Sequence, residues 1–284
     1  MNIKEIQRSI FLQLLPSMGE GEARSVTGLL LKHFTTYNNL YINLYPETEI
    51  DFDTITSINE AVQQLMENAP IQYVLGETVF CDLPFFVDAS VLIPRPETEE
   101  LVLWIIKNNL QASKFLDICT GSGCIAVSLA NYIENSIVYG VDISEEALET
   151  ARKNALLNKT NVHFMQYDVL NNGFANAVDM LFDVIVSNPP YVREIEKQYM
   201  HKRILDYEPA QALFVEDENP LLFYHSVLKF GQTHLINGGQ LYFEINELYG
   251  KEVVCLYEEY GYTRINLRQD IHGKDRMICG TMLK

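Results

Sequence analysis

The pattern of hydrophobic and polar positions changes part-way along the chain. In the first part, isoleucine and leucine recur every three or four residues, as in Ile3, Ile6, Ile10 and Leu14. This spacing places them on one face of an α-helix. The stretch "EARSVTGLLLKHF" predicts a second helix, and Ser57-Ile58-Asn59-Glu60 matches a capping box that predicts the start of a third. We therefore expect residues 1–78 to form a small helical bundle that positions a partner.

Two different patterns follow the bundle. Residues 79–93, "VFCDLPFFVDASVLI", are rich in β-forming residues and are interrupted by proline and aspartate, which predicts a β-hairpin linking two domains. In residues 94–284 a helix is expected from Pro96, and from Lys114 onward apolar strand candidates alternate with amphipathic helices. The expected strands are residues 115–119, 137–141, 162–166, 181–187, 240–245, 263–267 and 277–282. The alternation predicts an α/β fold with a doubly wound, mainly parallel sheet, whose ligands bind at the carboxyl ends of the strands.

Composition narrows the class of protein. Of the 284 residues, 48% are hydrophobic, which is enough for a sizeable core. Charged residues interrupt the N-terminal apolar positions too early for a signal peptide, and no apolar run approaches membrane-spanning length. We therefore expect a soluble, cytoplasmic protein without membrane contact, and nothing in the sequence points to more than a monomer. The five cysteines include no C-x-x-C pair and the six histidines no H-E-x-x-H motif, so no disulfide framework or protein-built metal site is expected.

The charge is strongly acidic. Lys plus Arg number 21 and Asp plus Glu number 38, which gives a formal net charge of −17. Such a charge opposes long-range attraction to nucleic acid, whose binding rests largely on neutralising phosphates. It favours a basic protein partner.

Acidic residues accompany three successive strand candidates. In "FLDICTGSGCIAVSLA", Asp117, Gly121 and Gly123 lie where the first strand of the sheet ends and a helix begins. Glycines there let a ligand approach the backbone, but the motif is not the G-x-G-x-x-G of dinucleotide-binding folds. Asp142 ends the next strand, where an acidic residue can accept hydrogen bonds from ribose hydroxyls, and Asp168 follows the third. We expect these three carboxylates at one rim of the sheet.

The fourth strand candidate ends in an unusual sequence, "VSNPPY", Val186 to Tyr191. Neither proline can donate a backbone hydrogen bond, and both fix φ, while the residue before each proline is kept out of the helical region. The segment is therefore expected to be stiff and extended, with carbonyl groups that no strand ladder uses. Such a segment is suited to gripping a ligand.

Residues 114–191 resemble class I S-adenosylmethionine-dependent methyltransferases, a family with a seven-stranded, mostly parallel Rossmann-like sheet. The resemblance implies that the turn carrying Asp117 passes under the methionine part of the cofactor, that Asp142 holds the ribose, and that Asp168 and Val169 lie by the adenine. The implied turn residues are Cys119, Thr120, Gly121, Ser122 and Gly123. Cys119 stands where that family usually has its first glycine, so the backbone there must tolerate a Cβ atom.

Asn-Pro-Pro followed by an aromatic residue resembles methyltransferases that act on planar nitrogens. A planar nitrogen is a poor nucleophile, because its lone pair is delocalised into a π system. The side-chain oxygen of Asn188 and the carbonyl of Pro189 can accept its two hydrogens, with Asn188 also facing the cofactor. The resemblance also implies that Pro190 and Tyr191 shape the slot, and Tyr191 can stack on the flat group. Catalysis of this kind rests on orientation and charge stabilisation, and the motif alone leaves adenine, guanine and glutamine open as acceptors.

Longer segments of the sequence narrow the choice of methyl acceptor. "PIQYVLGETVFCDLPFFVDASVLIPRPETEELV", "YEPAQALFVEDENPLLFYHSVL", "GGQLYFEIN" and "DIHGKDRM" resemble the peptide chain release factor glutamine methyltransferases, the PrmC/HemK family. The resemblance implies methylation of the glutamine side-chain amide in the Gly-Gly-Gln loop of bacterial class I release factors, with S-adenosylhomocysteine as the other product. The segment from Ile93 to Glu99 then lines the site, and Arg95 either orders it or pairs with a local carboxylate, Glu97 or Glu99.

Two competing functions stay open on the sequence. A nucleic-acid adenine or guanine methyltransferase would need a basic channel, for which Lys197, Lys202 and Arg203 are the best candidates. A non-catalytic, cofactor-binding interaction module is disfavoured by the intact Asn188–Tyr191 segment. Gly238-Gly239-Gln240 within this chain is interpreted as a turn followed by the start of a strand.

Overall fold

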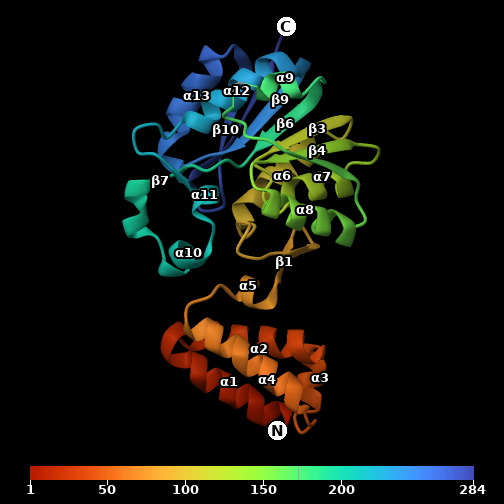
Figure 1. Cartoon of the computed structure of the whole chain (residues 1–284), viewed down its shortest axis with the longest axis vertical. Coiled ribbons are helices and arrows are strands. Elements are labelled where there is room, and N and C mark those ends of the chain that lie inside the picture. Colours follow the sequence, from red (N-terminus) through yellow and green to blue (C-terminus); the bar gives the residue numbers. More distant parts are fainter. Residues whose placement is uncertain (172) are drawn as a thin grey trace. The chain divides into compact units, whose positions relative to one another are not determined.

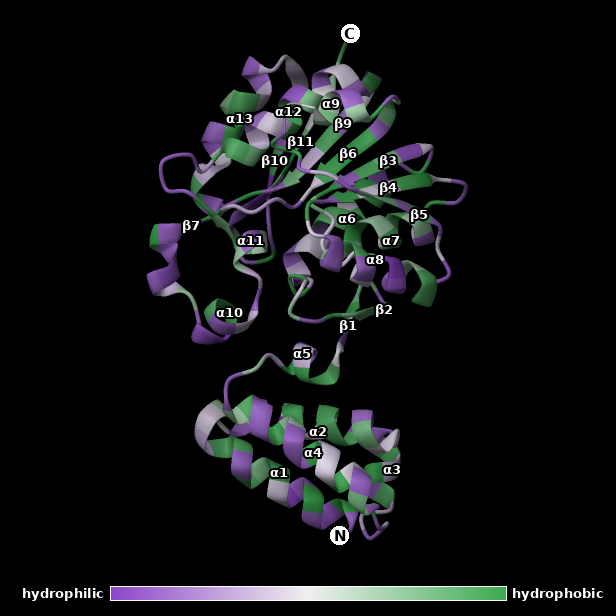
Figure 2. Ribbon diagram, viewed as in Figure 1, coloured by the Kyte–Doolittle hydropathy of each residue, from purple (hydrophilic) through white to green (hydrophobic). Residues whose placement is uncertain are grey.

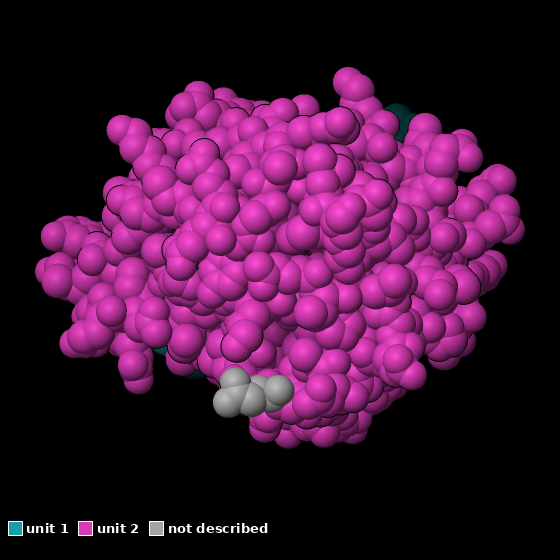
Figure 3. Space-filling view, turned by 90° about the horizontal axis from the view of Figure 1, so that it is seen from above, with its two compact units in different colours: residues 1–76, 201–207 teal, residues 77–200, 208–284 magenta. Residues whose placement is uncertain are grey.

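A computed structural model describes residues 1–171 and 173–284, and its chain divides into two compact units. Unit 1 comprises Met1–Gly76 together with His201–Tyr207, and unit 2 comprises Glu77–Met200 together with Glu208–Lys284. Figure 3 colours the two units separately. Among the described residues, no helix combines the length and the apolar character needed to cross a bilayer.

Unit 1 is a helical bundle. Ile3, Ile6, Ile10 and Leu14 are the buried residues of its first helix, as their spacing predicts, and they join one core with residues of the second and fourth helices. In Figure 2 hydrophobic and hydrophilic residues alternate along these helices. The short segment that returns to this unit is fixed by a hydrogen bond from the Tyr207 hydroxyl to the Glu67 carbonyl, 2.9 Å. The helices are α1 (Ile3–Met18), α2 (Glu20–Thr35), α3 (Asn39–Leu44), α4 (Phe52–Met66), α5 (Ile71–Leu75) and α10 (Lys202–Tyr207).

Helix α4 corrects one prediction. It does not begin at the capping box near Ser57 but at Phe52, because Asp51 caps it by accepting a hydrogen bond from the Thr54 amide, 2.9 Å. A carboxylate at this position satisfies one of the free N–H groups of the first turn. Ser57 lies inside the helix, where its hydroxyl donates to the Asp53 carbonyl.

Unit 2 is built on a seven-stranded sheet with the order β10-β11-β9-β6-β3-β4-β5 (Figure 1). The pairs that join β9, β6, β3, β4 and β5 are all parallel, and β11 runs antiparallel to both β9 and β10. This confirms the predicted α/β class and mainly parallel sheet. The strands are β3 (Lys114–Ile118), β4 (Ile137–Asp142), β5 (Val162–Gln166), β6 (Phe182–Ser187), β9 (Leu235–Glu244), β10 (Tyr262–Gln269) and β11 (Asp275–Met282).

Helices cover both faces of the sheet, which gives two cores. Neighbouring residues of β3 point to opposite faces: Phe115 packs in one core with α6 and α7, and Leu116 packs in the other with α12 and α13. Burial on both faces explains why the central strands read as continuous apolar runs. The helices are α6 (Pro96–Asn108), α7 (Cys124–Tyr132), α8 (Glu145–Leu157), α9 (Phe174–Ala177), α11 (Ala210–Leu213), α12 (Leu222–His234) and α13 (Gly250–Glu259).

A hairpin of β1 (Glu77–Phe80) and β2 (Leu83–Phe86) precedes the sheet. It overlaps the region, residues 79–93, where a hairpin was expected, and begins two residues before it. It is tied to α8 by Asn154, whose amide accepts from the Phe86 N–H, 2.6 Å, and donates to the Phe86 carbonyl, 3.0 Å. The same amide donates to the Ser122 carbonyl, 2.9 Å. Asn154 therefore joins the hairpin to the glycine turn after β3.

Strand β9 corrects a second prediction. It begins at Leu235 and not at Gln240, so Gly238 and Gly239 lie within the strand. Phe182 pairs with Leu235 and Val184 with Gln240, so β9 carries extra residues opposite β6. Gly238 has φ +84°, a conformation that glycine adopts readily. The glycine pair forms an irregularity inside a strand, and not a turn before it.

Short elements connect β6 to α12 and were not predicted. Strands β7 (Val192–Arg193) and β8 (Phe214–Val215) form a two-stranded parallel pair, and 3₁₀ helix η1 (Glu194–Tyr199) follows β7. A second 3₁₀ helix, η2 (Glu247–Tyr249), precedes α13. Elements this short contain too few residues to show the repeating hydrophobic pattern from which helices and strands are predicted.

Candidate active site

A cavity of about 420 Å³ lies within unit 2. Its walls come from the ends of β3 and β4, the residues after β5 and β6, the segment before α6, and α11. This is the edge at which parallel α/β sheets bind their ligands. The volume is in the range that holds a small cofactor.

The glycine turn after β3 has three residues with positive φ. They are Cys119 at +62°, Gly121 at +53° and Gly123 at +78°. A Cβ atom added to Gly121 would meet nothing within 4 Å, whereas one added to Gly123 would lie 3.0 Å from the Ala151 Cβ. Gly121 therefore leaves open space beside the cavity, and Gly123 allows the turn to pack closely on α8.

Cys119 keeps the left-handed conformation that a glycine would hold at this position. A non-glycine residue there costs roughly 1–2 kcal/mol, so the surrounding turn enforces the geometry, and the Cβ atom is tolerated. Burial raises the pKa of the Cys119 thiol well above its usual value, and the charges of Asp142, Asp117 and Asp168 add to the effect. The thiol is therefore neutral, and it faces a region of negative potential.

Asp142 braces the glycine turn from the end of β4. Its Oδ2 accepts from the Gly121 N–H, 2.8 Å, and its Oδ1 accepts from the Ser144 N–H, 3.1 Å. Ser144 in turn caps α8 by accepting from the Ala147 N–H. A carboxylate has about four acceptor sites, so each oxygen of Asp142 keeps a lone pair for a ligand in the cavity. Burial raises the pKa of Asp142, and the backbone hydrogen bonds oppose that rise.

The end of β5 supplies a further part of the wall. Asp168 lines the cavity, and its Oδ1 accepts from the Leu170 N–H, 2.8 Å. Val169 lines it as well, and its carbonyl accepts from the Ser226 hydroxyl, 2.7 Å. A local hydrogen bond thus fixes the carboxylate of Asp168, and a hydrogen bond from α12 fixes the backbone of Val169 beside it.

Asp117 lies behind this wall and not on it. The side chain is fully buried, with Oδ2 accepting from the Thr120 hydroxyl, 2.5 Å, and from the Ala126 N–H, 3.2 Å. No hydrogen-bond partner for Oδ1 lies among the residues that the structure describes. Burial raises the pKa of Asp117 to about 7, and the nearby Asp142 charge also raises it.

The raised pKa of Asp117 predicts a pH-dependent stability. From about pH 4 to about pH 7 the native protein holds a proton that the unfolded chain has released. Its contribution to the unfolding free energy is therefore full below pH 4 and is lost as the pH rises through 7. We compare the unfolding free energy of wild type with that of Asp117→Asn. The wild-type value minus the variant value is expected to fall between pH 5 and 7, by at most about 1.4 kcal/mol per pH unit.

Urea denaturation of both proteins across this pH range measures that difference. A difference that stays constant between pH 5 and 7 would show that the folded protein does not raise the pKa of Asp117 into this range.

The Asn-Pro-Pro-Tyr segment follows β6. Asn188 and Pro190 line the cavity, whereas Pro189 and Tyr191 are not part of its wall. The Asn188 Nδ2 donates to the Thr98 hydroxyl, 3.2 Å, and the Tyr191 hydroxyl donates to Glu244 Oε1, 2.9 Å. The only proton of the Tyr191 hydroxyl is therefore used in the hydrogen bond to Glu244.

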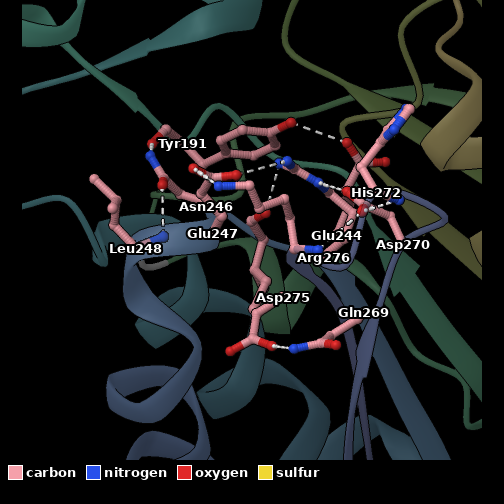
Figure 4. Close-up of polar contacts among 12 residues, drawn as sticks. Tyr191, Glu244, Asn246, Glu247, Leu248, Gln269, Asp270, His272, Asp275 and Arg276 are labelled. Atoms are coloured by element: carbon pink, nitrogen blue, oxygen red, sulfur yellow. Dashed lines mark hydrogen bonds and ion pairs between the residues drawn. The ribbon is translucent and has the colours of Figure 1, made fainter.

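Residues on α6, at the end of β9 and just before η2 hold this segment through hydrogen bonds, and Figure 4 shows part of the network. The Asn246 Nδ2 donates to the Tyr191 carbonyl, 3.2 Å. Burial raises the pKa of Tyr191 well above its usual value, and the charge of Glu244 adds to this. Tyr191 is a neutral hydrogen-bond donor fixed at both its backbone and its side chain.

The chain resembles known proteins over most of its length. Residues 10–76 match the family model for the PrmC N-terminal domain, and residues 97–214 match that for the Methyltransferase small domain. The chain is 47% identical over 277 residues, 95% of this chain and 96% of the relative, to the release factor glutamine methyltransferase of Flavobacterium psychrophilum. The chain belongs to the release factor glutamine methyltransferase family.

Other comparisons agree with this assignment. The release factor glutamine methyltransferase of Bacteroides thetaiotaomicron is 46% identical over 221 residues, which cover 78% of this chain and 79% of that relative. Among solved structures, a methyltransferase from Pyrococcus furiosus is similar with a TM-score of 0.54 and 20% identity. The match covers 72% of this chain and 91% of that one, and it supports the Rossmann-like methyltransferase fold.

Most of the predicted site residues meet at the cavity of this methyltransferase. Asp117, Gly123, Pro189 and Tyr191 are the predicted residues outside its wall. The predicted residues on the wall are Arg95, Cys119, Thr120, Gly121, Ser122, Asp142, Asp168, Val169, Asn188 and Pro190.

Arg95 has a different partner from the two local ones considered above. Its guanidinium pairs with Glu208, which is buried and also accepts from the Ile93 N–H, 3.3 Å. Pairing with Glu97 or Glu99 is therefore wrong, and Glu99 instead accepts from the Cys81 N–H, 2.7 Å. The Arg95–Glu208 pair joins two segments of the methyltransferase that lie far apart in the sequence.

Two of the three basic residues considered for a nucleic-acid channel are paired with acidic ones. Lys197 forms an ion pair with Glu194, and Arg203 forms one with Glu22 at 3.3 Å. Lys197 belongs to unit 2, whereas Arg203 and Lys202 belong to unit 1. These three residues do not make one basic surface within either unit.

Three residues of the site were given no role of their own in the sequence analysis, although one of them, Thr98, lies in the segment Ile93–Glu99 that was expected to line the site. Thr98, Glu208 and Glu244 are buried polar residues that hold wall residues in place. All three fall within segments that carry the family resemblance, but neither periodicity nor spacing marks them. Their partners are between 90 and 146 residues away in the sequence.

Proposed function

We propose that this methyltransferase transfers a methyl group from S-adenosylmethionine to the side-chain amide nitrogen of a glutamine. The proposed acceptor is the Gly-Gly-Gln motif of bacterial class I peptide chain release factors, in the cytoplasm. The observation that carries the proposal is the setting of Asn188. Its side chain lines the cavity and is held through Nδ2 by Thr98, which leaves Oδ1 to accept a hydrogen bond from an acceptor amide.

The cavity suits the proposed cofactor. Open space at Gly121 lets the methionine part approach the turn backbone, and Asp142 keeps acceptor sites for two ribose hydroxyls. Val169 and Asp168 are proposed to lie by the adenine. The acidic groups that raise the pKa of Cys119 also favour a cation. When bound, S-adenosylmethionine supplies a methyl group on a positively charged sulfur, and S-adenosylhomocysteine remains after the transfer.

The acceptor amide is proposed to be oriented by Asn188 and Pro189. The Asn188 Oδ1 and the Pro189 carbonyl accept the two amide hydrogens and thereby aim the nitrogen lone pair at the methyl group. Pro190 and Tyr191 shape the slot, and Arg95 orders the segment before α6. Because the φ angles of both prolines are fixed, the acceptors hold their positions before the substrate arrives, as preorganised catalysis requires.

The acceptor proton is proposed to leave for water after the methyl group has moved. Within the described part of the chain, the side chain that hydrogen-bonds Asn188 is Thr98, which does not titrate near neutral pH. Methylation at this nitrogen therefore rests on orientation by hydrogen bonds. A general base close to the amide is not required.

The test is methyl transfer from labelled S-adenosylmethionine. The acceptors to compare are a purified bacterial release factor, its variant with alanine in place of the motif glutamine, double-stranded DNA and ribosomal RNA. We expect label on the intact release factor and none on the variant. Label on DNA or ribosomal RNA in place of the release factor would keep the planar-nitrogen chemistry and refute the protein acceptor.

A further inference from the structure

A buried carboxylate connects the two ends of the Asn-Pro-Pro-Tyr segment. Glu244, at the end of β9, is 1% exposed. Its Oε2 accepts from the Thr98 hydroxyl, 2.6 Å, and its Oε1 accepts from the Tyr191 hydroxyl, 2.9 Å. Figure 4 shows the Tyr191 hydroxyl directed toward Glu244. Thr98, on α6, is 2% exposed and accepts from the Asn188 Nδ2, 3.2 Å.

The direction of each hydrogen bond in this chain is set by Glu244. An ionised carboxylate can only accept, so the one hydroxyl proton of Thr98 points at Glu244. The Thr98 oxygen then has only lone pairs to offer to Asn188. The asparagine amide must present its NH₂ group to Thr98, and its oxygen faces the other way, toward the position proposed for the acceptor amide.

The alternative orientation would defeat the proposed function. If the Asn188 amide turned over, its oxygen would face the Thr98 lone pairs and its NH₂ group would face the N–H groups of the acceptor. Both contacts would bring like groups together, and a buried polar atom without a partner is costly. The same carboxylate holds the hydroxyl of Tyr191, so one residue orients both ends of the segment.

Arg276 partly offsets the cost of burying the charge of Glu244. Burial raises the pKa of Glu244 above its usual value, and the charge of Glu97 adds to this, while the hydrogen bonds from Thr98 and Tyr191 and the charge of Arg276 limit the rise. Arg276 is fixed by Asp270, with 3.2 Å between Nε and Oδ2. Its positive charge favours the ionised, accept-only form of Glu244.

We propose that Glu244 and Thr98 are positioning residues for methyl transfer, which fix the orientation of the Asn188 amide through a one-way chain of hydrogen bonds. Neither residue is required to touch the reacting atoms. The inference rests on the proposed function, because it assumes that Asn188 Oδ1 accepts from the methyl acceptor.

The test compares two substitutions at Thr98. Thr98→Val has nearly the same shape but lacks the hydroxyl, so the Asn188 amide loses the contact that fixes it. We expect kcat for methyl transfer to the release factor to fall about 10- to 100-fold, because small errors of position in the reacting group have effects of this size. Thr98→Ser restores the hydroxyl, and we expect its kcat to lie within about threefold of wild type.

Further measurements separate positioning from stability. The affinity for S-adenosylhomocysteine and the thermal midpoint of Thr98→Val should change no more than those of Thr27→Val. Thr27 is the matched control, because it is also 2% exposed but its hydroxyl donates to the Ala23 carbonyl of its own helix, 2.7 Å. Glu244→Gln should lower kcat less in the Thr98→Val background than in wild type, because both changes break the same chain.

Each outcome bears on the proposal. It is overturned by an unchanged kcat in Thr98→Val, by a kcat for Thr98→Ser as low as that for Thr98→Val, or by equal effects of Glu244→Gln in the two backgrounds. A fall in kcat matched by an equal fall in Thr27→Val would overturn it as well. If wild type does not methylate the release factor, the proposed function itself has failed, which the wild-type assay shows separately.

Discussion

Asn188→Ala lowers the kcat of methyl transfer by about 10²- to 10³-fold, the size expected when one preorganised hydrogen-bonding group is removed from a catalytic site. The Asn188 side chain lies on the cavity wall, held by Thr98, and alanine leaves no group there that can accept from the acceptor nitrogen. The affinity for S-adenosylhomocysteine should change little, because Asp142 and the glycine turn are untouched. Initial rates with saturating release factor and calorimetric binding measure the two quantities.

A matched asparagine separates this effect from a general one. Asn131, on α7, is exposed, and Asn131→Ala should keep wild-type turnover. Persistent activity in Asn188→Ala would remove Asn188 from the catalytic role proposed here. Loss of cofactor affinity in proportion to the loss of rate would assign it to cofactor binding instead.

Asp142→Asn weakens the binding of S-adenosylmethionine by about 10- to 100-fold. The carboxylate accepts from the N–H groups of Gly121 and Ser144, and an asparagine side chain has only one acceptor oxygen. Its NH₂ group must therefore face either a backbone N–H or the ribose. Hydrogen bonds to a charged group contribute about 1.5–3 kcal/mol, and each 1.4 kcal/mol is a tenfold change in affinity.

Calorimetric titration of the purified variant with S-adenosylmethionine measures this change. Glu149→Gln is the control, because it also removes one negative charge, from an exposed position on α8. We expect its affinity to equal that of wild type. Equal weakening in both variants would mean that overall charge, and not the contacts of Asp142, governs cofactor binding.

Much of the fold was predictable because it rests on local patterns. The strands of the sheet alternate between two cores, so β3 to β6 read as apolar runs bounded by turn residues, and their bounds agree with the structure to within a residue. The start of α4 was not predictable in the same way, because two capping signals compete in one stretch. Asp51 prevails, since the helix that it caps extends six residues further toward the N-terminus than one capped at Ser57.

The site was predictable where the chain supplies it in one piece. The glycine turn comes directly after β3, and the other site residues lie at the ends of β4 and β6, so predicting these strands also predicts where the residues lie. The contacts that hold these residues in place are long-range and are not predicted in this way. Glu244 meets Thr98 across 146 residues, and Glu208 meets Arg95 across 113. Contacts at such separations depend on the order of strands in the sheet, which a pattern of apolar residues does not specify.

The order of strands has a consequence for the chain during its synthesis. The core of the bundle in unit 1 is contained in residues 3–75, so it can form early. In the sheet, β11 lies between β9 and β10, although both precede it in the sequence. Until Met282 has been made, β9 keeps an open edge on an apolar strand, and such edges promote aggregation. The nascent catalytic unit is therefore the part of this protein expected to depend on chaperones.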